Sequence, residues 1–323
     1  MAKNEFQLDW HSKRAKRIIG MVLAGLLVLY VILPQLLGLN SFKQGALPHD
    51  WRDVYLAGGY FALTFVVSAV SIMFLAFKRL GFAKTLLVQF ASVPLNMLLP
   101  AGIGNMGVNF MYLRHRHHTP MRAGMVVSAN NLLGVAGNLS VLVVLFAVYG
   151  FNSSDIQLYW HYIYWIVIAG LILVILAFIS LRLMRSHIEH IRNFKRQMLN
   201  ALNNYNERPI SFIGAYLCAI AQALLTALAF WYCLQAYGIR LSYQDAFLVF
   251  SLSVIVRTGV PTPGGLGGVE ASLVAGIVAT HASSLVVAVA SVLAFRLITY
   301  WLPLVAGAAA LYMVERTRLL SLN

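Results

Sequence analysis

The sequence has few charged residues and very few acidic ones. Only 11% of its 323 residues are charged, and 24 Lys and Arg outnumber 10 Asp and Glu. Soluble globular proteins carry about 25% charged residues, because their water-exposed surface has to be polar. Hydrophobic residues make up 60% of this chain, so a soluble enzyme and a disordered protein are both excluded. The composition predicts an all-α polytopic membrane protein.

Cysteine and the common catalytic motifs are scarce or absent too. Cys218 and Cys233 fall in one apolar segment, where a helix would hold them roughly 22 Å apart, far beyond disulfide reach. No P-loop, Ser/His/Asp grouping or His-Glu-x-x-His motif occurs, so no ATP motor is expected. The histidine-rich run 114–118 has no carboxylate or cysteine nearby, and we expect neither a metal nor a cofactor.

Six apolar runs are long enough to cross a bilayer, which takes about 20 helical residues. The predicted spans are residues 18–39, 54–77, 123–149, 159–181, 210–236 and 284–313. Basic residues precede the first run, but no cleavage site follows it, so it is expected to be a retained span. Residues 1–17 and 314–323 are expected to be cytoplasmic tails.

Two further apolar segments, residues 85–113 and 246–280, are broken in the middle. The breaks read Pro100-Ala101-Gly102-Ile103-Gly104 and Pro263-Gly264-Gly265-Leu266-Gly267, and they share one pattern of proline, glycine and aliphatic residues. Each half is too short to span, and proline and glycine at the junction oppose one continuous helix. Both segments are therefore predicted to be re-entrant helix pairs.

The basic residues give an independent prediction of topology. If both broken segments are re-entrant, 19 of the 24 Lys and Arg fall on the cytoplasmic side, as expected in a plasma membrane. Both termini are then cytoplasmic, and residues 18–150 and 159–313 form an inverted repeat, as in several transporters. Residues 183–205 carry an apolar stripe beside basic residues. They are predicted to lie on the cytoplasmic leaflet, or alternatively to pack on the bundle as a charged linker helix.

The two breaks are the first place to look for a binding site. Irregular backbone at membrane depth occurs where protein or a watered cavity surrounds it. Helices that begin near Asn105 and Gly268 would also direct free N–H groups toward an anion. The alternative is that the glycines only allow helices to pack closely.

Charged residues at membrane depth are few. Glu270 is the one carboxylate predicted well inside, and Arg257 and Arg296 accompany it. Their sum is positive, which favours an anionic lipid head group, although a purely structural ion pair remains an alternative. Asn130 and Asn131 are predicted to face the bundle interior or to line the cavity.

The second break and the last span carry a family resemblance. Residues 261–270, residues 295–303 and Gly307 resemble the lysylphosphatidylglycerol synthase transmembrane-region family, which includes the flippase half of the multiple peptide resistance factor. The resemblance implies a lipid translocator with re-entrant helices. Asn105 stands where family members commonly have a glutamate, and Asn130 with Asn131 where they have a charged pair. A site with so few carboxylates is poorly suited to cationic lysyl-phosphatidylglycerol.

The leading hypothesis is ATP-independent flipping of a phospholipid or polyprenyl-linked lipid. The candidate substrate-binding residues are Pro100, Gly102, Gly104, Asn105, Asn130, Asn131, Arg257, Pro263, Gly264, Gly265, Gly267, Gly268, Glu270, Arg296 and Tyr300. The expected partners are membrane lipids with an anionic head group, with a homo-oligomer possible and nucleic acid excluded. Two alternatives stay open: an intramembrane transferase or accessory subunit of a glycolipid or polyprenyl-lipid pathway, with Glu270 or a loop histidine as base, and a scaffold without substrate.

Overall fold

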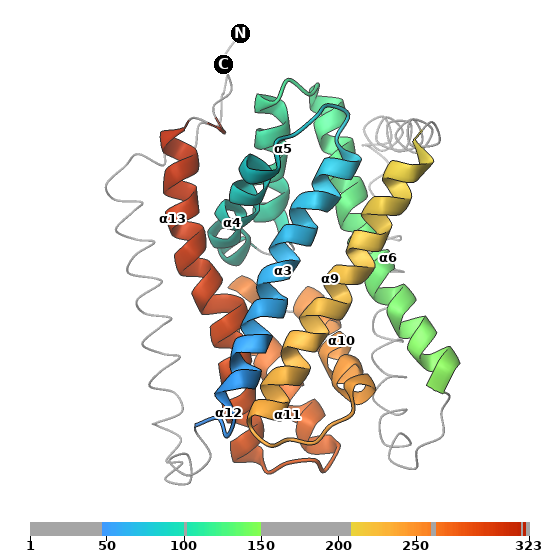
Figure 1. The fold of residues 1–323 in the computed structure, drawn as a ribbon, viewed down its shortest axis with the longest axis vertical. Coiled ribbons are helices and arrows are strands. Elements are labelled where there is room, and N and C mark those ends of the chain that lie inside the picture. The colour runs from blue at the N-terminus through green and yellow to red at the C-terminus, as the bar shows by residue number, and fades with distance from the viewer. Residues whose placement is uncertain (1–46, 100–101, 150–207, 260–262, 318, 321–323) are drawn as a thin grey trace, which may run out of the picture. The chain divides into compact units, whose positions relative to one another are not determined.

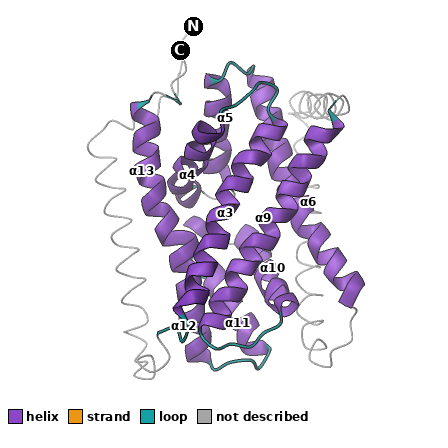
Figure 2. Cartoon of the chain, viewed as in Figure 1, coloured by secondary structure: helices purple, strands orange, loops and turns teal. Residues whose placement is uncertain are grey.

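A computed structural model describes residues 47–99, 102–149, 208–259, 263–317 and 319–320. Within these residues every element of regular secondary structure is helical (Figure 2). Several sequence-based expectations lie outside the described residues: the tail 1–17, the spans 18–39 and 159–181, and the helix 183–205.

The described part of the chain contains four long apolar helices. They are α3 (Trp51–Leu75), α6 (Pro120–Tyr149), α9 (Pro209–Ala236) and a last helix that joins α12 (Leu285–Arg296), the turn Leu297–Trp301 and α13 (Leu302–Arg316). Each is long and apolar enough to cross a membrane. These helices confirm four of the predicted spans, and the protein is a multi-pass membrane protein.

The central pair of helices is α3 and α9, which lie side by side (Figure 1). The Asp50 carboxylate caps α3 by accepting the Arg52 N–H at 2.8 Å, and Pro209 begins α9, both as helix starts prefer. Between the two helices the rings of Tyr60 and Tyr232 stack with centroids 5.2 Å apart. Gly214 of α9 lies against Phe74 of α3, where a Cβ would stand 3.0 Å from the ring, and such small residues allow the close approach of helices in lipid.

The two broken segments form two short helix pairs. They are α4 (Phe82–Leu98) with α5 (Ile103–His115), and α10 (Tyr243–Gly259) with α11 (Gly268–Ala279). The helices of each pair contact each other, and the two pairs lie toward opposite ends of the bundle (Figure 1). No helix among the four exceeds 17 residues, so neither segment forms a continuous spanning helix, as predicted.

The helix contacts of the two halves correspond to each other. Helix α3 contacts α4 and α6, whereas α9 contacts α10 and α12. Helix α5 packs on α6, and α11 packs on α12 in the same way. Across the halves, α13 packs on α4, and α6 contacts α10. Each of these pairings in one half thus has a counterpart in the other.

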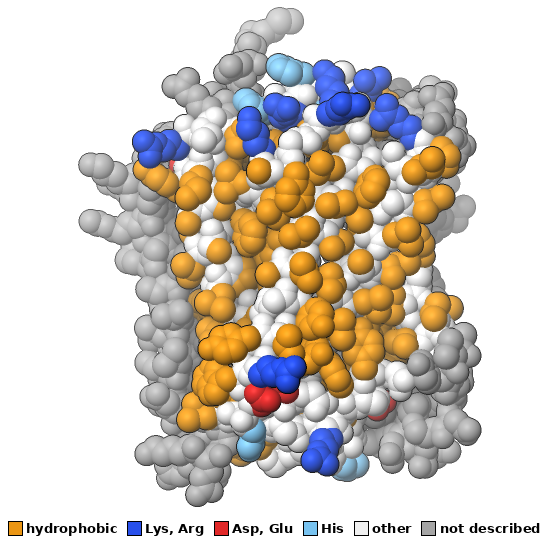
Figure 3. All heavy atoms as spheres, viewed as in Figure 1, with side chains coloured by type: hydrophobic (Ala, Val, Ile, Leu, Met, Phe, Trp, Pro, Cys, Tyr) orange, Lys and Arg blue, Asp and Glu red, His pale blue; other side chains and the backbone are white. Residues whose placement is uncertain are grey.

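Basic side chains gather at one end of the bundle, beyond a broad hydrophobic band (Figure 3). The end of α3, the start of α4, the α5–α6 turn and the ends of α9 and α13 supply Lys78, Arg79, Lys84, Arg114, Arg116, Arg122, Arg208 and Arg316. Arg122 and Arg208 lie over the ring of Phe77, at 5.4 and 5.6 Å from its centroid. These basic residues therefore share one end of the described bundle.

Candidate functional site

A cavity of about 410 Å³ lies where the two broken pairs meet the long helices. About half of its lining residues carry hydroxyl or amide side chains, which come from six different helices. These polar residues are Thr64, Ser68, Gln89, Ser92, Asn96, Asn105, Asn138, Gln222, Thr226, Thr299 and Tyr300. Polar groups inside a membrane protein are costly and usually functional, and the volume is in the range of ligand pockets.

The second break approaches the cavity through Gly264. Its φ is +64°, a value that L side chains rarely adopt. A Cβ at this position would also stand 2.3 Å from a ring carbon of Tyr300. The Gly264 carbonyl accepts a hydrogen bond from Nη2 of Arg296 at 3.2 Å. Glycine is therefore required for the backbone to reach the arginine.

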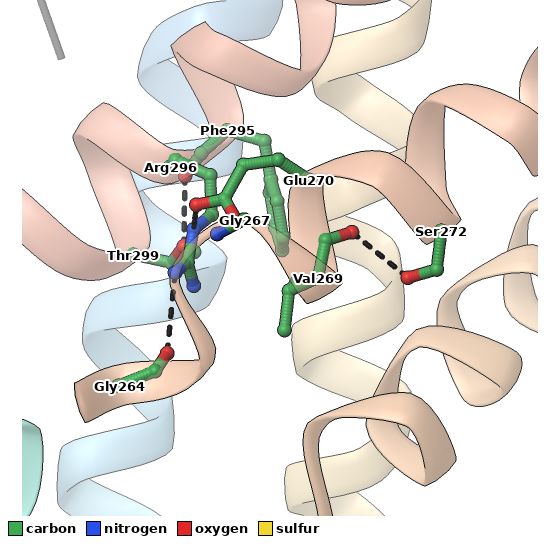
Figure 4. A network of polar contacts seen from close by, with 8 residues as sticks. All are labelled: Gly264, Gly267, Val269, Glu270, Ser272, Phe295, Arg296 and Thr299. Carbon is green, nitrogen blue, oxygen red and sulfur yellow. Dashed lines mark hydrogen bonds and ion pairs between the residues drawn. The ribbon is translucent and has the colours of Figure 1, made fainter. Parts of the chain in front are cut away.

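Arg296 and Glu270 form an ion pair beside this break (Figure 4). Arg296 Nε donates to Glu270 Oε1 at 2.6 Å, and Glu270 Oε2 accepts the Gly267 N–H at 2.7 Å. The guanidinium also lies over the ring of Tyr300, 4.7 Å from its centroid. Both carboxylate oxygens thus have a partner, and Glu270 ties the residue before α11 to the first turn of that helix.

This pairing changes the expected charge of the interior. Arg296 is the charged side chain among the described residues that line the cavity, and Glu270 balances it. Arg257 belongs to α10, but its side chain lies outside the described residues. The predicted surplus of positive charge therefore depends on Arg257. The structure shows the Glu270–Arg296 ion pair that the sequence offered as an alternative.

The last span is interrupted directly after Arg296. Residues Leu297–Trp301 form a π-helical turn, so the single helix expected for residues 284–313 is divided. Pro303 explains the division, because it has no N–H to donate to the Thr299 carbonyl in an α-helical pattern. The turn brings Thr299, Tyr300 and Pro303 to the cavity. Such π-helical turns are frequent at functional sites.

The first break is held by a chain of uncharged side chains. Ser68 Oγ donates to Gln89 Oε1 at 3.0 Å, and Gln89 Nε2 donates to Asn109 Oδ1 at 2.8 Å. Asn109 Nδ2 then donates to Asn105 Oδ1 at 2.7 Å and to the Asn105 carbonyl at 3.0 Å. This amide chain, defined by these four residues, joins α3, α4 and α5. It holds Asn105 at the cavity.

Two glycines of the first break have different structural roles. A Cβ on Gly104 would lie 2.1 Å from the carbonyl carbon of Leu95, so α5 begins in direct backbone contact with α4. Gly102 precedes α5 with a φ of +76°, and no side chain caps the helix there. Gly104 thus allows close packing of α5 on α4.

The structure brings some predicted residues to the cavity and leaves others aside. Asn105, Gly264, Arg296 and Tyr300 line it. Glu270 pairs with Arg296 and accepts the Gly267 N–H, and the buried Gly265 and the first residue of α11, Gly268, complete the break. Pro100 and the side chains of Pro263 and Arg257 lie outside the described residues.

Asn130 and Asn131 are not among the lining residues. Asn130 Oδ1 accepts a hydrogen bond from Ser71 Oγ at 2.8 Å, between α3 and α6. Asn131 Nδ2 donates to the Val127 carbonyl of its own helix at 3.2 Å. Of the two predicted roles, contact between helices fits Asn130.

Several lining residues were missed by the sequence analysis, although a signal for them exists. Gln89, Ser92 and Asn96 follow each other at intervals of three and four, which places them on one face of α4. Gln222 and Thr226 are four apart on α9 in the same way. Polar residues at helical spacing within apolar segments would have located this lining. Within the described ranges, no group of three or more His, Cys, Asp or Glu residues could hold a metal ion.

The fold and the cavity define a class: a helical multi-pass membrane protein with two broken helix pairs around a polar cavity. The sequence matches the family described as lysylphosphatidylglycerol synthase TM region over residues 17–307. The chain belongs to this family, as its resemblance in the second break and last span suggested. Membership connects the protein with membrane lipids. A comparison with curated proteins found no match.

Proposed function

We propose that this protein moves a phospholipid or a polyprenyl-linked lipid between the leaflets of the plasma membrane without ATP. The observation that carries the proposal is the cavity of about 410 Å³, lined by hydroxyl and amide groups within an apolar bundle. A lipid head group crosses hydrocarbon slowly because its polar atoms lose their hydrogen bonds to water. The cavity would replace those bonds while the acyl or prenyl chains stay in the bilayer.

The helix contacts support an exchange mechanism. The corresponding pairings of the two halves favour the inverted repeat of six spans and two re-entrant pairs. In transporters of that design, one repeat rocks against the other around a central site. The gathering of basic residues at one end (Figure 3) supports cytoplasmic termini.

A phosphate-bearing head group fits the hydrogen-bond donors of the cavity best. Arg296 lines the cavity. Its Nε and Nη2 donate to Glu270 and Gly264, and its Nη1 can donate to a ligand. The first turn of α5 has no side-chain cap, and its N–H groups adjoin Asn105. Guanidinium groups and uncapped helix N-termini both bind phosphate well.

A liposome assay tests the proposal directly. Purified protein is reconstituted into liposomes with lipids that are fluorescently labelled on an acyl chain. A membrane-impermeant reductant then quenches the labels that are exposed in the outer leaflet. We expect the quenched fraction to rise well above the outer-leaflet share, because lipids exchange during the assay. Equal quenching with and without protein, across anionic, zwitterionic and polyprenyl lipids, contradicts translocation.

Variants and lipid analysis separate translocation from its alternatives. Arg296→Ala and Glu270→Ala should each abolish exchange while inserting normally, whereas Arg316→Ala at the exposed end of α13 should keep it.

Lipid extracts of a deletion strain test the alternative that the protein is a transferase. A missing lipid product indicates an enzyme, and normal lipids in the wrong leaflet indicate a translocator.

A further inference from the structure

We infer that the cavity selects lipids whose head group carries free hydroxyls on or beyond its phosphate and no ammonium, such as a glycerol, inositol or sugar head. This inference rests on the proposed function and names the substrate class. It follows from the direction of the hydrogen bonds in the amide chain, from the pairing of Glu270 with Arg296, and from a buried amide oxygen of Asn96 that has no hydrogen-bond partner.

A backbone carbonyl fixes the direction of the amide chain. Asn109 Nδ2 lies 3.0 Å from the Asn105 carbonyl oxygen, which can only accept a hydrogen bond, so the NH₂ end of Asn109 faces Asn105. Asn109 Oδ1 must then accept from Gln89 Nε2. Gln89 Oε1 in turn accepts from Ser68 Oγ. The orientation of the three amides therefore does not depend on an arbitrary choice of amide flip.

The fixed direction decides what Asn105 presents to the cavity. Its Oδ1 accepts from Asn109 at 2.7 Å, and its NH₂ group has no partner in the described part of the chain. Asn105 thus faces the cavity as a hydrogen-bond donor. Arg296 is a donor as well. Groups that accept hydrogen bonds, such as phosphate and hydroxyl oxygens, are therefore suited to these two positions.

An ammonium group finds no negative partner among the described lining residues. It is a donor only, so it cannot accept the hydrogen bonds that Asn105 and Arg296 offer. Glu270, the carboxylate next to the cavity, uses Oε1 for Arg296 and Oε2 for the Gly267 N–H. An ammonium beside these two donors has no carboxylate of its own to pair with, so an ethanolamine or lysyl head group is disfavoured relative to a hydroxyl-bearing one.

Asn96 adds the requirement for hydroxyl hydrogens. Its Oδ1 is buried and has no hydrogen-bond partner, it belongs to the cavity lining, and it lies 3.8 Å from the position of a Cβ on Gly102. A hydroxyl can pair with the Asn96 amide in either of its two flipped orientations and can also accept from Asn105, whereas a phosphate diester oxygen can only accept. A polyhydroxyl head group therefore satisfies both sides of the first break.

A lipid panel in proteoliposomes tests the selection with the unmodified protein. Acyl-labelled phosphatidylglycerol, phosphatidylinositol, phosphatidylethanolamine, phosphatidylcholine and lysyl-phosphatidylglycerol are compared for the rate of leaflet exchange. We expect the first two to exchange at least about tenfold faster than the others, the factor given by one uncompensated polar group. Phosphatidic acid, which has a phosphate but no alcohol hydroxyl, should also be slow.

The outcomes separate this inference from the proposed function. Equal rates for all lipids overturn the hydroxyl selection and leave translocation standing, as does faster exchange of the amine-bearing lipids. Fast phosphatidic acid together with slow amine lipids contradicts the role of Asn96. Exchange of no lipid at all overturns translocation, and the inference with it.

Asn105→Asp provides a matched reversal. The aspartate keeps an oxygen for Asn109 but replaces the NH₂ donor with a negative charge. The ratio of phosphatidylglycerol to phosphatidylethanolamine exchange should fall at least about tenfold. Gln244→Glu, the same chemical change near the start of α10 and outside the cavity lining, should leave the ratio unchanged. An unchanged ratio in Asn105→Asp, in protein that remains monodisperse, overturns the assignment of Asn105.

Discussion

The first and second breaks occupy corresponding places in the two halves but are held by different chemistry. At the first break, the amide chain joins α3, α4 and α5 without any formal charge. At the second, Glu270 and Arg296 join α11 to the last span as an ion pair. The first arrangement depends on complete hydrogen bonding, and the second on keeping both charges together.

This difference shows how one backbone design gives a neutral cavity in two ways. The first break contributes no charge, and the second contributes two charges that cancel. The penalty for damage should therefore differ between them. Loss of one member of a buried ion pair leaves a charge uncompensated, whereas loss of one amide partner leaves only a dipole.

The largest effect is expected from Arg296→Met. Glu270, whose side chain is 18% exposed, then loses its cation, and breaking a buried pair in this way typically costs about 3–5 kcal/mol. The double variant Arg296→Met/Glu270→Gln should recover much of that loss, because no charge remains. Thermal unfolding in detergent measures both, with Arg316→Met as the exposed control. A double variant no more stable than the single one shows that the charges do not act as a pair.

The breaks could be predicted from the sequence, and much of the site could not. Proline and glycine at residues 100–104 and 263–267 interrupt an apolar run wherever the helices go. The partner of Glu270 could not be chosen, because Arg257 and Arg296 are equally plausible until the distances between helices are known. The amide chain also depends on the register between α4 and α5, which brings Gln89 to Asn109. Local sequence does not determine this register.

Gly104→Ala tests the packing of the first break. The new Cβ would meet the backbone of Leu95 at 2.1 Å, so α4 and α5 must separate, and overpacking of this kind costs about 1–3 kcal/mol. Gly107→Ala in the same helix has nothing within 4 Å and should be neutral or slightly stabilising. The difference in melting temperature between the two variants measures the effect. Equal values contradict the close approach of the helices.

Ser68→Ala should have a smaller effect at the same break. Gln89 Oε1 loses its donor, which costs about 1 kcal/mol for an uncharged hydrogen bond. The loss should be the same at low and high salt, because no charge is involved. Ser283→Ala, at an exposed loop bond between neighbouring residues, is the control. A strong salt dependence of the Ser68→Ala effect would mean that the amide chain is coupled to charge.

The smallest effect concerns His118, in the turn that follows the first helix pair. Burial lowers the pKa of His118 below its usual range, and the nearby Lys78 and Arg122 act in the same direction. The folded protein therefore binds this proton less readily than the unfolded chain does. Stability should fall as the pH drops below about 6.5, the value of an ordinary histidine. Melting curves at pH 7.5 and 5.5 show this as a small loss.

His118→Phe should reduce that loss, because the titrating group is removed from its buried place. His117→Asn is the control, since His117 is exposed and has a φ of 60° that asparagine tolerates. If both variants keep the same pH dependence as the unmodified protein, His118 is not its source.

The π-helical turn makes one span serve both breaks. An extra residue in a turn advances the following helix face by about 100°. Before the turn, Arg296 faces the second break. After it, Gly307 lies so close to α4 that a Cβ would stand 2.6 Å from the Phe90 carbonyl oxygen. Removing one residue from Leu297–Trp301 would rotate these two contacts out of phase, so the turn determines how the face that holds the second break is oriented relative to the face that packs on α4.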